Sequence, residues 1–196
     1  MGTIITVTKR LAARQEIEGA IRALAGHRNY IAAELLASAA IDVVAGVCKD
    51  SGITTISERF NERIKPDKRV EVRKLMRHPY NFLKHSDRDK NSAIDRYDSG
   101  AALWRVMIAI LDYEACWKTR TFPMLIYMSW FFSRNPDIVQ EESKHISESF
   151  SRFFGDIKAM SEREALATLG SVFKQFDDVS AQAMNHALFD VEHIER

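Results

Sequence analysis

Apolar residues recur every three or four positions through most of the chain, which is the spacing of an amphipathic α-helix. The pattern predicts helices over about residues 8–25 and 29–49, and their short link favours an antiparallel pair. A long helix is expected over 97–119, and the almost wholly apolar and aromatic run at 122–132 predicts a buried helix. A further amphipathic helix is expected over about 137–158.

Polar residues mark where two of the helices begin. Thr55 with Glu58, and Ser161 with Glu164, have the spacing of a capping box, in which two side chains satisfy the free amides of a helix start. The first box predicts a short helix that ends before Pro66. The second predicts a helix that runs to about residue 178.

Between the short helix and the long one, a proline divides the pattern. Residues 67–77 are predicted to be helical, and Pro79 is predicted to break or restart the helix. Residues 80–85 then form one or two turns of a new helix, which leads into a polar loop at 86–91.

Composition supports an all-α, single-domain helical bundle. The chain has 196 residues, enough for one domain with a substantial core, and only four prolines and eight glycines to form turns. The hydrophobic fraction of 46% and the charged fraction of 28% are typical of a globular protein and argue against a disordered chain. We expect one α-helical domain over 1–196, with a mildly amphipathic tail at 181–196 that frays or docks on a partner.

The two cysteines, Cys48 and Cys116, lie in apolar runs and form no Cys-x-x-Cys motif. A disulfide framework or a thiolate zinc site is not expected, and the two residues are interpreted as small buried hydrophobic side chains. The first residues, Met1–Val7, are followed by Lys9 and Arg10, the wrong order for a secretory signal.

The run at 101–117 is interpreted as the most apolar long stretch, yet it contains Arg105, Asp112 and Glu114. Charged residues at these positions predict a core helix instead of a membrane span. We therefore expect a cytoplasmic protein with no membrane partner.

Charge is unevenly distributed although the net charge is only +1. Residues 65–90 contain nine Lys/Arg and four Asp/Glu, whereas residues 135–196 contain six and twelve. A local basic patch of this kind attracts an anion or a phosphate backbone. The alternative, that it is a solvated helix face, is equally open at this point.

A carboxylate–histidine metal site has weak support. A ferritin-like site needs Glu-x-x-His on two helices, and the chain has one such match, Glu142-x-x-His145, which Glu34 could in principle join. A surface Glu–His pair is the favoured interpretation, and we expect neither a metal nor another cofactor.

The basic segment carries residues suited to RNA chemistry. Asn81 and His85 are four positions apart and share a helix face, and Lys84 and Arg88 form a second such pair. Histidine can act as general base or acid near neutral pH, and Lys or Arg can hold a phosphate. These groups are the minimum for metal-independent RNA cleavage, in which the 2′-hydroxyl is the nucleophile.

A structural interpretation of the same residues competes with the catalytic one. Asn81 and His85 would cap helix ends, and the basic residues would pair with Asp87 and Asp89. Spacing alone favours this interpretation.

The segments Asn29–Asp42 and Asn81–Asp89 resemble uncharacterised bacterial helical proteins that in turn are similar to the HEPN superfamily (higher eukaryotes and prokaryotes nucleotide-binding domains). The similarity covers roughly residues 10–135. HEPN proteins are helical bundles, often dimers, and many are RNases of toxin, abortive-infection or CRISPR systems. Their motif is Arg, four to six residues, then His. Asn81-x-x-x-His85 matches its second half, with Tyr80 where the Arg would stand.

The resemblance implies a homodimer that binds or cleaves RNA without a metal, in a toxin or defence system. It makes His85 and Asn81 the candidate catalytic residues. The candidate phosphate-binding residues are Lys84, Arg77, Arg88 and Arg73. Since many HEPN-like proteins do not catalyse a reaction, the alternative is a non-enzymatic helical interaction or nucleotide-binding module.

Overall fold

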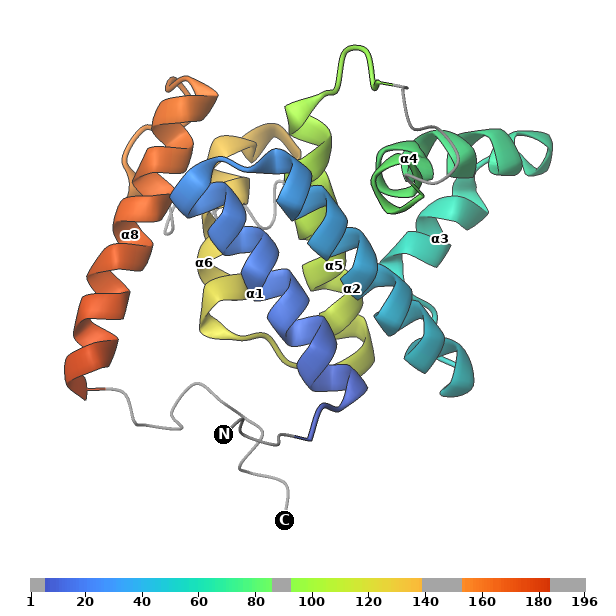
Figure 1. Ribbon diagram of the computed structural model, residues 1–196, viewed down its shortest axis with the longest axis horizontal. Coiled ribbons are helices and arrows are strands. Elements are labelled where there is room, and N and C mark those ends of the chain that lie inside the picture. The colour runs from blue at the N-terminus through green and yellow to red at the C-terminus, as the bar shows by residue number, and fades with distance from the viewer. Residues whose placement is uncertain (1–5, 86–92, 139–152, 184–196) are drawn as a thin grey trace. The chain divides into compact units, whose positions relative to one another are not determined.

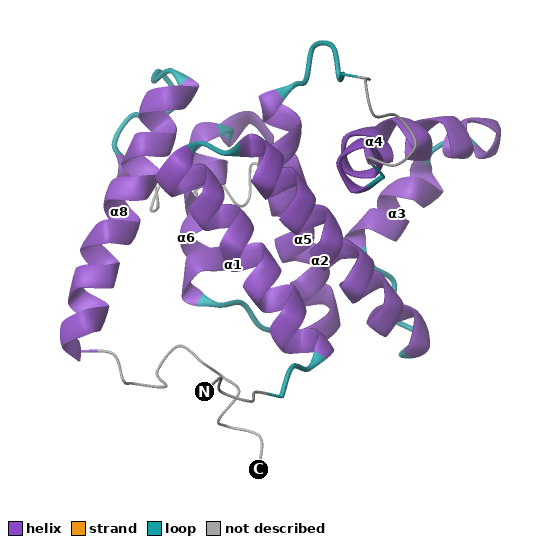
Figure 2. Cartoon of the chain, in the orientation of Figure 1, coloured by secondary structure: helices purple, strands orange, loops and turns teal. Residues whose placement is uncertain are grey.

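The computed structural model describes residues 6–85, 93–138 and 153–183 (Figure 1). All regular secondary structure in these residues is helical and none of it is strand (Figure 2), which confirms the all-α class. The chain packs into two compact units. One comprises Met1–Ala20 and Tyr30–Lys118, and the other comprises Ile21–Asn29 and Thr119–Arg196. The prediction of a single domain over 1–196 stays a prediction.

The first unit contains most of the helices. They are the start of α1 (Lys9–His27), then α2 (Tyr30–Asp50), α3 (Ile56–Arg63), the 3₁₀ turn η1 (Pro66–Lys68), α4 (Arg69–Lys84) and α5 (Ser99–Trp117). The second unit contains the end of α1, then α6 (Phe122–Arg134), the 3₁₀ turn η2 (Pro136–Ile138) and α8 (Glu162–Ala183). Most predicted boundaries are correct to within a few residues. Much of the helix expected over 137–158, and the tail from residue 184 on, lie outside the described residues.

Small side chains allow α2 to pack closely along α5. Ala33, Ala37 and Ala40 of α2 and Ala102 and Ala109 of α5 are all fully buried. Because an alanine projects only a methyl group, the two helix backbones can approach closely. This helix pair forms the apolar centre of the first unit.

The early part of α1 packs against α2. A Cβ atom at Gly19 would lie 3.3 Å from Leu36 Cδ1, which leaves little room for a side chain there. Figure 1 shows the two helices side by side and antiparallel, as the short link between them predicted. Their contact extends the α2–α5 core into a third helix.

Two sets of hydrogen bonds fix the start of α3. The predicted capping box is confirmed, because Thr55 Oγ1 accepts from Glu58 N at 3.1 Å and Thr55 N donates to Glu58 Oε2 at 2.8 Å. In addition, the buried Asp112 of α5 accepts from Ser57 N at 3.1 Å and from Ser57 Oγ at 2.5 Å. Burial raises the pKa of Asp112, opposed by the hydrogen bonds from Ser57.

The break predicted at Pro79 was wrong, because α4 runs without interruption from Arg69 to Lys84 with Pro79 inside it. Proline has no N–H to donate to the carbonyl of Leu75, which is the usual cost of a proline in a helix. The next carbonyl, that of Met76, accepts a hydrogen bond from the guanidinium of Arg105 on α5. This tertiary contact supports the helix where the proline weakens it.

Aromatic side chains form the core of the second unit. Trp130, Tyr127 and Phe131 of α6 are buried, as the apolar run predicted, and Trp130 Nε1 donates to the carbonyl of Ala165 at 2.7 Å. At Gly170 of α8 an added Cβ would lie only 2.5 Å from a backbone oxygen. Glycine is therefore required for this close approach.

Candidate phosphate-binding surface

Three cations lie along one face of α4. Arg73, Arg77 and Lys84 occupy positions i, i+4 and i+11, which on a helix fall in a single narrow stripe about 16 Å long. All three side chains are exposed. We call these three residues the α4 cation stripe.

An aromatic ring lies beneath two members of the stripe. Tyr80 is only 6% exposed, and its ring centroid is 5.7 Å from the Arg77 guanidinium carbon and 5.4 Å from Lys84 Nζ. Cations at this distance are attracted to the negative face of the ring. Tyr80 therefore restrains two positive charges at the protein surface while its own ring stays covered.

Arg77 has a competing partner on α2. Its Nη2 atom is 2.8 Å from Asp42 Oδ2, and both side chains are partly exposed. The pair borders a small pocket at the surface. The pocket lies among α2, α4 and α5 and is lined by Ser38, Ile41, Asp42, Met76, Arg77, Tyr80 and Arg105. Asp42 thus neutralises the middle cation of the stripe.

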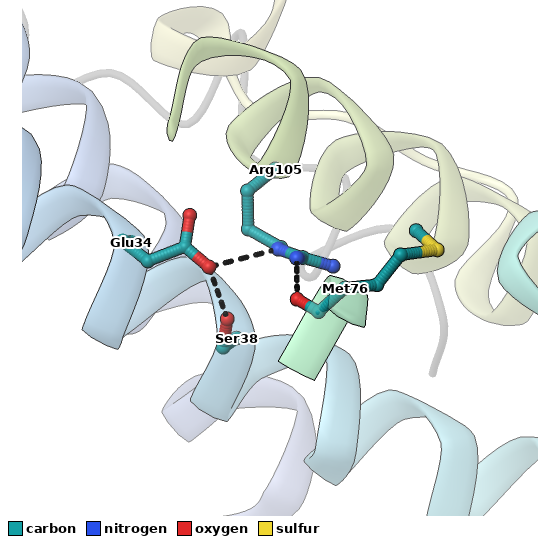
Figure 3. Close-up of polar contacts among 4 residues, drawn as sticks. All are labelled: Glu34, Ser38, Met76 and Arg105. Atoms are coloured by element: carbon teal, nitrogen blue, oxygen red, sulfur yellow. Dashed lines mark hydrogen bonds and ion pairs between the residues drawn. The ribbon is translucent and has the colours of Figure 1, made fainter. Parts of the chain in front are cut away.

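Arg105 fixes α4 to the α2–α5 core (Figure 3). Its Nε atom is 3.1 Å from Glu34 Oε1 on α2, and its Nη2 atom donates to the Met76 carbonyl on α4. Glu34 is fully buried and also accepts a hydrogen bond from Ser38 Oγ at 3.4 Å. Burial raises the pKa of Glu34, and the charge and hydrogen bond of Arg105 oppose that shift. One guanidinium therefore joins three helices.

The candidate catalytic pair lies next to the stripe. The side chain of Asn81 is exposed, and His85, partly buried, forms the C-cap of α4 by donating its backbone N–H to the Asn81 carbonyl at 3.0 Å. Neither side chain makes a hydrogen bond to any residue that the structure describes. The helix end is thus capped by the backbone N–H of His85, and no side chain among the described residues occupies the Asn81 or His85 side chain.

The surroundings of the stripe are also basic. Residues 59–85 contain nine Lys/Arg and three Asp/Glu. Some of these cations are engaged locally, since Lys68 pairs with Glu71 at 3.0 Å and Arg69 donates to the Ile64 carbonyl at 3.0 Å. Arg73 forms no ion pair with any residue in 6–85, 93–138 or 153–183. Its charge is therefore available to an anion.

The structure brings together five of the six predicted site residues. Asn81 and His85 adjoin the cation stripe, whereas Arg88, like Asp87 and Asp89, lies outside the described residues. The sequence interpretation missed Asp42, Tyr80 and the Arg105 clamp. A signal existed for Arg105, because a charged residue in an apolar helix needs a partner.

The weak metal hypothesis loses one of its ligands in the described part of the chain. Glu34 is occupied by Arg105, and His145 lies outside the described residues. Among the residues that the structure describes, no group of three or more His, Cys, Asp or Glu side chains could hold a metal ion.

One helix of those described, α2, is long and apolar enough to cross a membrane by length and composition. The core helix of a folded domain meets the same criterion. Two of its carboxylates, Glu34 and Asp42, pair with Arg105 and Arg77.

No family model, no curated protein and no solved structure matches this chain. The resemblance to HEPN proteins stays a prediction, and a proposal about function depends on the geometry of α4.

Proposed function

We propose that this protein binds RNA by holding its phosphate backbone along the α4 cation stripe, on a bundle of the HEPN type in the cytoplasm. The observation that carries the proposal is the alignment of Arg73, Arg77 and Lys84 on one exposed helix face about 16 Å long. A stripe of this length can follow more than one phosphate of a strand. Backbone contacts of this kind supply most of the affinity of non-specific nucleic-acid binding.

The same geometry indicates how the RNA is recognised. Tyr80 is covered by its neighbours, so it cannot stack on a base, and recognition by the stripe depends on phosphate and sugar. Asn81, exposed beside the stripe, offers a donor and an acceptor to a 2′-hydroxyl, the group that distinguishes RNA from DNA. We expect binding with little sequence preference and with some preference for RNA.

Salt dependence tests this proposal directly. Because Asp42 occupies Arg77, two phosphate contacts on a single strand, those of Arg73 and Lys84, give a slope of log K against log salt of about −1.4. Fluorescence anisotropy of a labelled single-stranded RNA, titrated with protein between about 50 and 200 mM salt, measures it. Matched DNA and a nucleoside triphosphate serve as competitors. Absence of binding, binding insensitive to salt, or equal displacement by the free nucleotide would contradict RNA-backbone binding.

A second candidate function is metal-independent cleavage of the bound RNA. The observation in its favour is that the Asn81 and His85 side chains, four positions apart at the end of the stripe, have no hydrogen-bond partner among the described residues. His85 would take the proton of the 2′-hydroxyl, Asn81 would orient the reacting groups, and the cations would stabilise the charge that develops on phosphate. For this cleavage function we propose a homodimer that brings two copies of His85 to one site. The protein would then act in a toxin or defence system.

Cleavage is separated from binding by one comparison. The parent protein and His85→Ala are incubated with labelled RNA in excess chelator, and products are resolved on a gel. Loss of about 100-fold or more in rate in the variant, with unchanged RNA affinity, supports His85 as the base. Binding without cleavage by the parent protein would contradict the cleavage function and leave RNA binding intact.

A further inference from the structure

The two cysteines of the chain lie at corresponding ends of two packed helices. Cys48 is in the last turn of α2, and Cys116 is in the last turn of α5. Arg105 meets Glu34 near the starts of the same helices, with a distance of 3.1 Å between Nε and Oε1. Ser57, which follows the end of α2, donates to Asp112 near the end of α5. The starts of α2 and α5 therefore lie together, and so do their C-terminal ends, which means that the two helices run in the same direction.

The two thiols lie on the facing sides of the helix pair. Both cysteines are free. Cys48 follows Glu34 by 14 positions and Cys116 follows Arg105 by 11, so each cysteine shares a helix face with one member of the Glu34–Arg105 ion pair. Cys116 is also among the causes that raise the pKa of Cys48. A second link holds this end of the helix pair, because Asp112, one turn before Cys116, accepts two hydrogen bonds from Ser57. Thiols on the facing sides of two packed helix ends have the arrangement from which an interhelical disulfide can form.

We propose that Cys48 and Cys116 form a redox-sensitive pair that closes into an intramolecular disulfide between α2 and α5 when a small-molecule disulfide such as oxidised glutathione is present. This differs from the sequence interpretation, which treated the cysteines as separate hydrophobic residues. The sequence offered no signal for the pair, because the two positions lie far apart along the chain.

The reaction proceeds in two exchanges. Cys116 is partly exposed and Cys48 is fully buried, so the reagent meets Cys116 first. The Cys116 thiolate attacks one sulfur of the reagent and forms a mixed disulfide, and one thiol leaves. The Cys48 thiolate then attacks the Cys116 sulfur, forms the internal bond and releases the second thiol. Two electrons pass from the cysteines to the reagent, and the two cysteine protons end on its two released thiols.

The surroundings of Cys48 predict that the closing exchange is slow at neutral pH. Burial raises the pKa of Cys48 to about 12, assisted by Cys116 and by the charges of Asp112 on α5 and Glu58 on α3. Since only the thiolate attacks, the rate should increase with pH. Asp112→Asn removes one of the two opposing charges, so it should close the disulfide faster than the parent protein at the same pH.

The crosslink would close a loop that carries α3 and α4 between the two bonded helices. It would restrain the unfolded chain and stabilise the α2–α5 pair against unfolding. The α4 cation stripe is not part of the bond, so this inference is independent of the proposed RNA binding. The two can fail separately.

The test uses the full chain, oxidised glutathione and intact mass. After incubation at pH 8, the protein is unfolded and treated with an alkylating reagent, and its intact mass is measured by mass spectrometry. We expect a monomer that has lost two hydrogen atoms and takes up no alkyl group. Cys48→Ser should stop at one glutathione adduct on Cys116, and Cys116→Ser should stay largely unmodified. A parent protein that takes up two alkyl groups, keeps its adduct, or forms only disulfide-linked dimers would overturn the proposal.

Discussion

The α2–α5 pair and α4 belong to the same compact unit but use charge in opposite ways. Glu34 and Arg105 are withdrawn from solvent and bonded to each other, and Asp112 is bonded to Ser57. On α4, Arg73 and its neighbouring cations remain in water. Buried charges require partners, whereas exposed ones do not. The buried charges therefore position the helices, and the exposed charges are left for a ligand.

The difference gives each region its own expected response to substitution. Changes in the α2–α5 pair should lower stability and affect binding only through the position of α4. Changes in the α4 cation stripe should alter RNA affinity and leave stability nearly unchanged. Any variant that reverses these responses would break the comparison.

The largest effect is expected at Glu34. Glu34→Ala leaves the Arg105 guanidinium, only 14% exposed, without its counter-ion, and breaking a buried pair costs about 3 kcal/mol or more. Urea denaturation measures the loss in the free energy of unfolding. The matched control is Glu71→Ala, which removes the exposed partner of Lys68 and should cost less than about 1 kcal/mol. Equal losses would mean that burial does not separate the two regions.

A smaller effect is expected for Arg105→Lys. Lysine keeps the charge but lacks the planar fork that reaches Glu34 and the Met76 carbonyl together, so one contact is lost at about 1–2 kcal/mol. Because the lost contact holds α4 at its proline, amide hydrogen exchange should accelerate in α4 more than in α2 or α5. Equal acceleration of exchange in all three helices would contradict the role of Arg105 in holding α4.

The pH dependence of stability should distinguish two carboxylates. The pKa of Asp112 is raised above its ordinary value of 3.8 by burial, so the folded chain binds this proton more tightly than the unfolded chain. The contribution of Asp112 to stability is therefore lost as pH rises from about 3.8 through the raised pKa. The stability of Asp112→Asn relative to the parent protein should consequently increase as pH rises through that window.

Glu164 is the control of opposite sign for this measurement. Hydrogen bonds from Ser161 lower the pKa of Glu164 below its ordinary value of 4.5. The stability that Glu164 contributes is present above pH 4.5 and is lost as pH falls through the lowered pKa. The difference in stability between Glu164→Gln and the parent protein should therefore shrink as pH falls. Urea midpoints between pH 3 and 7 test both variants, and parallel trends would contradict one assignment.

The smallest effect is expected at Asp42. Asp42→Asn removes the competitor of Arg77 and makes all three cations of the stripe available, so RNA affinity should rise by roughly two- to threefold. Stability should change by less than about 1 kcal/mol, since the pair is partly exposed. Anisotropy titration at fixed salt measures the change. Weaker RNA binding in the variant would show that Asp42 supports the surface instead of opposing it.

Local signals were sufficient to predict most of the helices. The capping boxes at Thr55 and Ser161 involve side chains three positions apart, so the sequence displays both partners together. The prediction at Pro79 failed because the helix is supported there by Arg105, which lies 29 positions along the chain from Met76, whose carbonyl it binds. Propensity rules describe an isolated helix and contain no such contact.

The sequence likewise predicted part of the candidate site, namely which residues share a helix face, but not their partners on other helices. The α4 cation stripe follows from helical spacing alone, so the positions of Arg73, Arg77 and Lys84 could be read from the sequence. The contact of Arg77 with Asp42 spans 35 positions, and that of Arg105 with Glu34 spans 71. Periodicity identifies which residues share a face, but only packing decides which face meets another helix.

The central claim is that the α4 cation stripe, and not net charge, binds RNA. The double variant Arg73→Ala with Lys84→Ala should be compared with Arg22→Ala with Lys49→Ala, a control pair on α1 and α2 that also removes two exposed positive charges. We expect the first pair to weaken RNA binding about tenfold or more at low salt and to reduce the salt slope by about 1.4, while the control pair changes affinity less than about twofold. Equal losses in both pairs would contradict a specific phosphate-binding surface on α4.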